Sequence, residues 1–222
     1  MNTKRFFRTI FILSALTVLL AGNIFSQEAA KIIEIEGIPG VLEWVIEPDS
    51  FTVKNRTVSI SAGPGTNMFY APHGNFNVSN MPKLLFKPDD NFTFSAKAYT
   101  KHKTKWEAAM LVVYINESYW AKFCFENESL SKNRMVTVVT NEVSDDAYSD
   151  YINGDSVYTM IKKEGKQITF SYSGDGKNWV DIRYFRLNSE DTLKIGFASQ
   201  SPIGKGLTSI FSDINYNRDI QK

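Results

Sequence analysis

The stretch from Trp106 to Asn141, WEAAMLVVYINESYWAKFCFENESLSKNRMVTVVTN, is the densest run of strand-forming residues in the chain. Its β-branched and aromatic residues predict three consecutive strands, over Trp106–Ile115, Tyr119–Glu126 and Arg134–Asn141. The whole chain contains roughly twelve such runs, with Gly, Pro and Asn turn signals about every 8–12 residues. No segment outside residues 1–26 has a convincing amphipathic helical pattern. The sequence therefore predicts an all-β sandwich of two antiparallel sheets.

Side chains in the middle strand of this stretch alternate between two faces. The apolar face, which we expect in the core, carries Tyr119, Ala121, Phe123 and Phe125. The other face is mixed and carries Trp120, Lys122, Cys124 and Glu126. A Trp ring can stack on the C–H face of a sugar while Lys and Glu bond to its hydroxyls, so we predict that Trp120, Lys122 and Glu126 bind a ligand. The alternative is that Lys122 and Glu126 pair with neighbours and Trp120 closes the rim.

Residues 63–80, GPGTNMFYAPHGNFNVSN, are rich in Gly, Pro and Asn and predict a long loop. We expect Asn67 and His73 of this loop, together with Arg134 and Asn141, to be further ligand contacts. His102, the second of two histidines, lies in a charged turn without partners at metal-ligand spacing. Residues 143–153 predict a polar, acidic loop.

The side-chain oxygens of four residues lie close together near the start of that acidic loop: Asn141, Ser144, Asp145 and Asp146. They either contribute to a Ca²⁺ site or form Asx-type turns, and the absence of EF-hand spacing favours turns. We predict neither a metal site nor a cofactor.

The composition limits the partners that the protein can bind. Aromatic residues make up 14% of the chain, which favours β-structure. Without residues 1–26, 22 of the 25 Lys and Arg residues remain against 24 Asp and Glu, a net charge of about −2. No basic stripe remains, so nucleic acid is not an expected partner. Cys124 is the only cysteine, so no intrachain disulfide can form.

Residues 1–26 have the pattern of a secretory signal peptide. Lys4, Arg5 and Arg8 form a charged segment, and TIFILSALTVLLA from Thr9 to Ala21 is the apolar segment that follows. This apolar run is short for a membrane span of about 20 residues, so we expect cleavage after Ser26 and no stable membrane anchor. The expected organisation is a signal peptide over 1–26, a leader over 27–40 and one sandwich domain over 41–218. The mature protein is expected to be periplasmic or extracellular in a bacterium, and its oligomeric state stays open.

Five short motifs occur in an order that resembles the regulation-of-enolase-protein-1-like family, a domain of unknown function with a concanavalin A-like jelly-roll fold. In chain order they are Thr66–Tyr70 with Gly74, Glu107–Glu126, Val138–Asn141 with Ser144-Asp145, Ser173–Trp179 with Arg183, and Ser201–Gly206 with Phe211–Ile214. Two positions depart from the family pattern, because Asn67 stands where Asp is usual and Ala109 where Gly is common. The family is similar in fold to lectins and glucanases, so the resemblance implies contact with carbohydrate.

No catalytic motif accompanies this fold signal. Glucanases of the resembled fold place two carboxylates at i and i+4 on one strand, and no such segment occurs here. Serine-hydrolase, zinc-protease and P-loop motifs are also missing from the sequence. The sequence therefore favours a non-catalytic, carbohydrate-binding protein and leaves two alternatives open. One is a glycoside hydrolase or lyase centred on Glu126, and the other is a protein-interaction module of the cell envelope.

Overall fold

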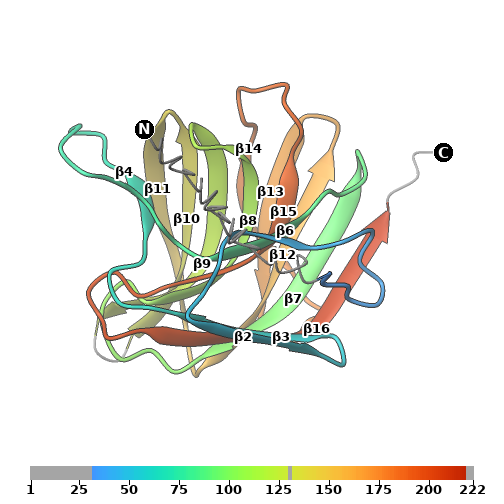
Figure 1. Cartoon of the computed structure of the whole chain (residues 1–222). Helices are drawn as coiled ribbons and strands as arrows, with labels where there is room; N and C mark the ends of the chain where they lie inside the picture. Colours follow the sequence, from blue (N-terminus) through green and yellow to red (C-terminus); the bar gives the residue numbers. More distant parts are fainter. Residues whose placement is uncertain (1–31, 130–131, 219–222) are drawn as a thin grey trace, which may run out of the picture. The chain divides into compact units, whose positions relative to one another are not determined.

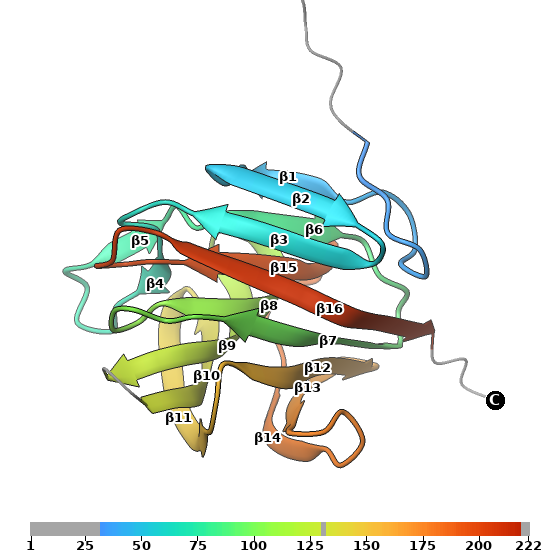
Figure 2. The same ribbon diagram turned by 90° about the horizontal axis from the view of Figure 1, so that it is seen from below.

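The computed structural model describes residues 32–129 and 132–218, and the proposed signal peptide lies outside these residues. The described part is built from two seven-stranded antiparallel sheets and a short two-stranded one (Figure 1). One sheet, which we call the cavity sheet, has the order β1-β6-β15-β8-β9-β10-β11. The opposing sheet has the order β14-β13-β12-β7-β16-β3-β2, and these strands run side by side in Figure 2. The predicted all-β sandwich is therefore confirmed.

The strand bounds in chain order are β1 (Glu43–Ile46), β2 (Ser50–Lys54), β3 (Thr57–Ala62), β4 (Met68–Tyr70), β5 (Asn77–Ser79), β6 (Lys83–Phe86), β7 (Phe92–Thr100), β8 (Ala108–Asn116), β9 (Tyr119–Ser129), β10 (Lys132–Asn141), β11 (Val143–Ile152), β12 (Ser156–Glu164), β13 (Gln167–Ser173), β14 (Val180–Phe185), β15 (Lys194–Gln200) and β16 (Leu207–Arg218). Residues 32–129 and 132–218 contain no helix that could span a membrane.

The core between the two sheets is aromatic and follows from the alternation of side chains along each strand. As predicted, Ala121, Phe123 and Phe125 of β9 are buried in it. The ring of Phe123 stacks on that of Phe170 in β13 of the opposing sheet, with centroids 4.9 Å apart and an interplanar angle of 6°. Such a pair contributes about 0.5–1.5 kcal/mol beyond the apolar area that it buries.

Two segments that the sequence predicts as loops contain strands. Residues 143–153 form the edge strand β11, paired along β10, and Glu142 makes the tight turn between them with a φ of 70°. The strand was missed because its outward face is exposed on an edge and carries acidic residues, which are typical of edges. Residues 63–80 include the β4–β5 hairpin, whose three-residue strands are too short for periodicity to reveal.

The leader predicted over residues 27–40 contributes to the core in its described part. Within its described part, a single antiparallel bridge joins Ile33 to Leu42. Ile33, Ile35 and Ile38 are nevertheless buried and belong to the main core. The hydrophobic core therefore takes in residues that precede residue 41.

A second hydrophobic cluster covers the outer face of the cavity sheet. This cluster includes side chains from three strands: Met110 and Val112 of β8, Trp120 and Cys124 of β9, and Val136 of β10. Met68 of the β4–β5 hairpin packs against them, and the backbone N–H of Tyr70 donates to the Ser144 hydroxyl of β11 at 2.9 Å. The hairpin thus lies over one end of this face and leaves the rest to form a cavity.

Candidate functional site

A cavity of about 570 Å³ opens on the outer face of the cavity sheet, and we call it the β9 cavity. Its floor comes from β9, β10 and β11, and its walls come from residues 65–78, from Trp106 and from residues 202–203. The residues that line it are Gly65, Asn67, Phe69, Ala71, His73, Phe76, Val78, Trp106, Lys122, Glu126, Val136, Val138, Asp146, Tyr148, Gln200, Pro202 and Ile203. Its size falls within the usual range for small-molecule sites.

The register of the sheet gathers the polar floor residues from three neighbouring strands. Lys122 of β9 stands opposite Val138 of β10, which in turn stands opposite Asp146 of β11. Glu126 follows Lys122 on the same face of β9, four residues along the strand. One ammonium and two carboxylates therefore line the same cavity.

Lys122 is the most deeply placed of these charges, with only 3% of its surface exposed. Its Nζ donates to Gln200 Oε1 at 2.9 Å and to Asn67 Oδ1 at 3.4 Å. Gln200 Nε2 donates to the Trp106 carbonyl oxygen at 2.9 Å, which turns the Gln200 oxygen toward Lys122. Both acceptors are neutral amides, and burial lowers the pKa of Lys122. Within the described chain, no carboxylate forms an ion pair with this ammonium.

Glu126, the buried carboxylate of the floor, has no cationic partner within the part of the chain that the structure describes. Its side chain is 5% exposed, and none of the described residues donates a hydrogen bond to its carboxylate. Burial raises the pKa of Glu126 to about 7, the positive charge of Lys122 opposes this shift, and the negative charge of Asp146 adds to it. A ligand hydroxyl can donate to Glu126 and accept from Lys122, so a polyol satisfies both groups.

Aromatic side chains form the rim above this polar floor. Trp106 is 40% exposed, Phe76 50% and Tyr148 51%, and all three line the β9 cavity. The Lys105 ammonium lies 4.8 Å from the centroid of the Trp106 ring. Polar groups at the base and exposed rings at the mouth form the arrangement that holds a sugar ring between stacking and hydrogen-bonding groups.

The structure brings four of the seven predicted ligand contacts together, namely Asn67, His73, Lys122 and Glu126. Asn67 Oδ1 accepts from the Met68 N–H at 2.8 Å as well as from Lys122, and His73 Nδ1 accepts from the Asn75 N–H at 3.1 Å. Both predicted residues of the 63–80 segment thus reach the cavity.

Trp120 does not line the β9 cavity, which corrects the expected stacking role. Its side chain is 1% exposed, and its Nε1 donates to the Glu117 carbonyl oxygen at 3.2 Å. The Tyr70 ring meets it edge-on, with centroids 5.9 Å apart. The β4–β5 hairpin that carries Tyr70 thus covers Trp120, so its ring supports the wall and has no free face for a sugar.

Arg134 and Asn141 also lie outside the β9 cavity. The Arg134 guanidinium pairs with Glu128 at 2.9 Å and lies over the rings of Tyr148 and Tyr151. Asn141 Oδ1 accepts from the Asn188 N–H at 2.8 Å. Arg134 contacts the lining residue Tyr148, whereas Asn141 ties β10 to the segment before β15.

The predicted oxygen cluster at the β10–β11 turn is also dispersed. Asp145 pairs with Arg183 at 2.9 Å, the Ser144 hydroxyl bonds to Thr140 at 2.8 Å, and Asp146 lines the β9 cavity. In the strand conformation, successive side chains point to opposite faces of β11. Among residues 32–129 and 132–218, no three His, Cys, Asp or Glu side chains are grouped to hold a metal ion.

Four lining residues that the sequence interpretation missed matter for the site: Trp106, Asp146, Tyr148 and Gln200. Asp146 and Tyr148 were missed because the sequence predicts residues 143–153 as a loop. The two residues are two positions apart, and in a strand such residues point to the same face. Gln200 stands just before the Ser201-Pro202 motif, and Trp106 just before β8, so both lie at strand ends that periodicity does not identify.

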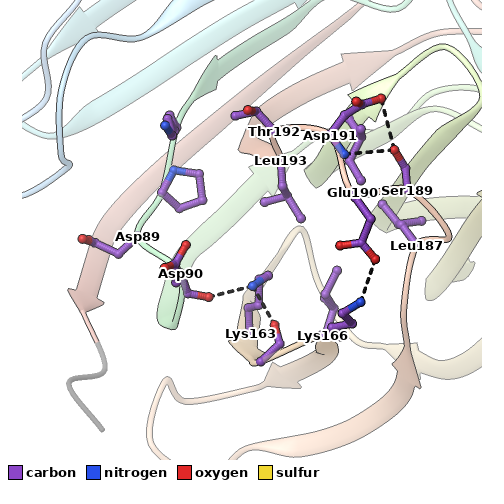
Figure 3. Close-up of a pocket in the computed structure, with 15 residues that line it drawn as sticks. Asp89, Asp90, Lys163, Lys166, Leu187, Ser189, Glu190, Asp191, Thr192 and Leu193 are labelled. Atoms are coloured by element: carbon purple, nitrogen blue, oxygen red, sulfur yellow. Dashed lines mark hydrogen bonds and ion pairs between the residues drawn. The ribbon is translucent and has the colours of Figure 1, made fainter.

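A second cavity, of about 380 Å³, is shown in Figure 3 and lies among residues 87–90, 163–168 and 187–193. Two of its lysines, Lys163 and Lys166, are already engaged by neighbouring groups. The Lys166 ammonium pairs with Glu190 at 2.6 Å, and Lys163 donates to the Asp90 and Gly165 carbonyl oxygens at 2.7 Å each (Figure 3). The β9 cavity, in contrast, has two buried charged side chains on its floor, Lys122 and Glu126, and neither forms an ion pair within the described residues, so we assign the candidate site to it.

Fold and site together define an antiparallel β-sandwich with a largely apolar cavity on the outer face of one sheet, whose floor carries a few charged side chains. The chain belongs to the family described as "Protein of unknown function (DUF1349)", whose model matches residues 44–219. A search of the curated proteins finds no match to the sequence. The more specific resemblance to the regulation-of-enolase-protein-1-like family stays a prediction.

Solved structures support the fold. A functionally unknown protein from Saccharomyces cerevisiae is similar over 81% of this chain and 97% of its own, with a TM-score of 0.75 and 19% identity. The GH43 BlXynB protein from Bacillus licheniformis matches 79% of this chain with a TM-score of 0.62 and 14% identity, but the match spans only 36% of that protein. The alginate lyase from Klebsiella pneumoniae matches 78% of this chain and 86% of its own, with a TM-score of 0.53 and 11% identity.

Proposed function

We propose that this protein is an exported, non-catalytic carbohydrate-binding protein of the concanavalin A-like jelly-roll class, and that it binds its ligand in the β9 cavity. The observation that carries the proposal is the pair formed by Lys122 and Glu126. Both are buried at the floor of one open cavity. Among the described residues, Lys122 bonds only to neutral amide oxygens and Glu126 forms no ion pair. Buried charges are normally paired, and adjacent ligand hydroxyls supply both a donor and an acceptor.

The aromatic rim adds a second reason. The exposed rings of Trp106 and Tyr148 offer stacking surfaces for the C–H face of a pyranose, at little cost in conformational entropy. Several structural relatives act on polysaccharides by their printed names, including a xylan β-1,4-xylosidase and an alginate lyase. Their identity to this chain is 10% and 11%, so they lend support to the class of ligand by analogy only.

Affinity gel electrophoresis against xylan, arabinan, β-glucan and alginate tests the binding function. The expected result is retardation by at least one polysaccharide. Trp106→Ala and Lys122→Met should each weaken it by about tenfold or more, since each removes a stacking or charged contact. Trp179→Ala is the matched control, because Trp179 lies in the β13–β14 turn and does not line the β9 cavity. Retardation that is absent throughout, or equal in all variants, would overturn the proposal.

Glycoside cleavage is a second candidate, favoured by one observation. Glu126 and Asp146 line the same cavity, and the pKa of Glu126, raised to about 7 by burial, suits a general acid at neutral pH. Release of reducing ends or of unsaturated products from the same polysaccharides, abolished in Glu126→Gln, would establish an enzyme. The envelope protein-interaction alternative predicts a filled, flat sheet face, and the β9 cavity argues against it.

Export rests on residues 1–26, with their three basic residues followed by an apolar run. Expression of the full chain in a bacterium followed by cell fractionation tests this part separately. We expect the protein in the periplasm or medium, with a mature N-terminus at Gln27 in Edman sequencing. A cytoplasmic protein that starts at Met1 would contradict the export proposal and leave the binding proposal intact.

A further inference from the structure

The backbone of Trp106, at the wall of the β9 cavity, has a left-handed conformation with a φ of 67°. A bulky side chain rarely adopts this conformation, because its Cβ crowds the backbone, whereas glycine tolerates it. Two hydrogen bonds hold the strained residue in place: the Trp106 N–H donates to the Asn127 carbonyl oxygen at 2.7 Å, and the Trp106 carbonyl oxygen accepts from Gln200 Nε2 at 2.9 Å. Strained residues of this kind concentrate at binding and catalytic sites.

The buried residue that follows, Glu107, accepts hydrogen bonds from two separate segments of the chain. Its Oε2 accepts from the backbone N–H groups of Lys103 and Thr104, at 2.5 and 3.0 Å, so the side chain closes the turn that carries Trp106. Its Oε1 accepts from the Ser201 hydroxyl at 3.1 Å. Hydrogen bonds to an ionised carboxylate are about twice as strong as those between neutral groups, so this one side chain anchors both segments.

Ser201 extends these contacts to a third segment, the one before β4. Its N–H donates to Thr66 Oγ1 at 2.9 Å, and its carbonyl oxygen accepts from the Gly65 N–H at 2.9 Å. Its hydroxyl oxygen also accepts from the Gly206 N–H at 3.2 Å, which closes the 201–206 loop. All three joined segments contribute lining residues to the β9 cavity, so they form one wall of it: Gly65, Trp106, Pro202 and Ile203.

The 201–206 loop packs directly on the Glu107 carboxylate at Gly204. A Cβ added to Gly204 would stand 2.3 Å from Glu107 Oε1 and 2.5 Å from Ser201 Oγ. The backbone of Gly204 is not left-handed, so the close approach to the carboxylate, and not the backbone conformation, requires glycine at this position. The wall is therefore built around Glu107.

We propose that Glu107 is a positioning residue for the β9 cavity: it keeps the wall formed by these three segments ordered and holds the Trp106 ring in place for a ligand. The strain at Trp106 reduces the stability of the fold, whereas a ring that is already ordered lowers the entropy cost of binding. The identity of the ligand rests on the function proposed above, but the order of the wall is a property of the protein alone.

Glycine and alanine variants of Trp106 test the strain, because only alanine keeps the Cβ that crowds the backbone. The urea midpoint of Trp106→Gly should therefore lie above that of Trp106→Ala. The backbone of Trp179 is not left-handed, so Trp179→Gly should have a lower midpoint than Trp179→Ala. A midpoint for Trp106→Gly at or below that of Trp106→Ala would overturn the strain at this position.

Amide hydrogen exchange measured by NMR tests the positioning role. The Gly65 and Gly206 amides both donate to Ser201, and we expect them to exchange about tenfold faster or more in Glu107→Gln and in Gly204→Ala. Gly174→Ala is the matched control, because Gly174 is not left-handed either and a Cβ there meets nothing within 4 Å. Phe170→Ala is a second control, which weakens the core between the sheets and should leave the exchange of both amides nearly unchanged.

The positioning role is overturned if both amides exchange as in wild type in a folded Glu107→Gln. It is also overturned if Phe170→Ala accelerates them equally, which would mean that Glu107 stabilises the sandwich as a whole. Affinity gels with the same four polysaccharides separate the two proposals. Where wild type is retarded, Glu107→Gln should weaken the retardation by about tenfold and Gly174→Ala should not, and equal retardation in Glu107→Gln also overturns the positioning role. If no polysaccharide retards wild type, the proposed function fails, and the exchange rates alone decide the role of Glu107.

Discussion

The Lys122 ammonium reaches across β8 to the Gln200 side chain of β15 and lies 2.9 Å from its Oε1. Lys122 stands opposite Val112 of β8, and Gln200 stands opposite Ala108 of the same strand, so the two side chains meet over the face of β8. This hydrogen bond holds the Lys122 ammonium at the floor of the β9 cavity. Its acceptor, the Gln200 amide oxygen, is neutral and does not cancel the charge. The charge therefore remains available to a ligand.

Replacing Lys122 with Met should separate stability from binding. Buried ammonium groups without an ion-pair partner stabilise a fold little, so the free energy of unfolding should change by less than about 1 kcal/mol. Ligand binding should nevertheless fall. Urea denaturation measures the first quantity and affinity gels the second, with Lys177→Met on an exposed turn as the control. A loss of more than about 3 kcal/mol in Lys122→Met would show that the lysine is mainly structural.

Glu126 should make the protein less stable as the pH rises. Its pKa is about 7 in the folded protein against an ordinary value of 4.5, so the folded state binds more protons between these values. The contribution of Glu126 to stability is then greatest below pH 4.5 and falls as the pH increases to about 7. At about 1.4 kcal/mol per pKa unit, the total loss is about 3 kcal/mol.

Glu126→Gln should remove this dependence. At pH 8 the variant should be more stable than wild type by up to about 3 kcal/mol, and near pH 4.5 the two should be equal. Urea denaturation of both proteins across this range provides the measurement. Parallel pH profiles would mean that Glu126 does not titrate in this window.

Glu107 should stabilise the protein more at neutral pH than at acidic pH, which is the opposite of the effect expected for Glu126. Burial alone would raise its pKa, but hydrogen bonds from the backbone N–H groups of Lys103 and Thr104 and from the Ser201 hydroxyl lower it. A depressed carboxyl pKa stabilises the folded state above the unfolded value, and this contribution is lost as the pH falls. Glu107→Gln should cost about 2–3 kcal/mol at pH 7, since it weakens charge-assisted bonds to a buried group.

The same urea denaturation series checks this prediction. Glu164→Gln, at the end of β12, is the exposed control and should change stability by less than about 0.5 kcal/mol. The difference between wild type and Glu107→Gln should shrink as the pH is lowered, because the wild-type carboxylate then becomes protonated. A difference that grows at acidic pH would contradict the assigned role.

Phe170 should be the most sensitive of the tested positions to truncation. Its ring stacks on Phe123 and meets Phe185 edge-on at 4.8 Å, and it is fully buried between the sheets. Phe170→Ala should lower the free energy of unfolding by about 3–5 kcal/mol through lost apolar contact and a residual cavity. Tyr184→Ala on the same sheet, where the ring is 61% exposed, should cost far less. Equal effects in the two variants would show that the stacked pair is not a centre of the core.

The order of residues was enough to predict the fold class and the core side chains of the central hairpin. Alternation along residues 119–126 separates Ala121, Phe123 and Phe125 from Lys122 and Glu126, because side chains of a strand point to opposite faces. The same two-residue alternation places Lys122 and Glu126 on one face of the strand, and it does not depend on the tertiary structure. This part of the site therefore follows from the order of the residues alone.

Which side chains share the β9 cavity depends on the pairing and covering of segments that are far apart in the chain. Trp120 has the spacing of a site residue, but the β4–β5 hairpin covers it, and Trp106 supplies the exposed indole instead. Gln200 reaches the site from a strand 78 positions away in the chain, through sheet order that periodicity does not encode. Periodicity assigns a face to each residue, whereas the pairing of distant strands decides what covers that face and what is left open.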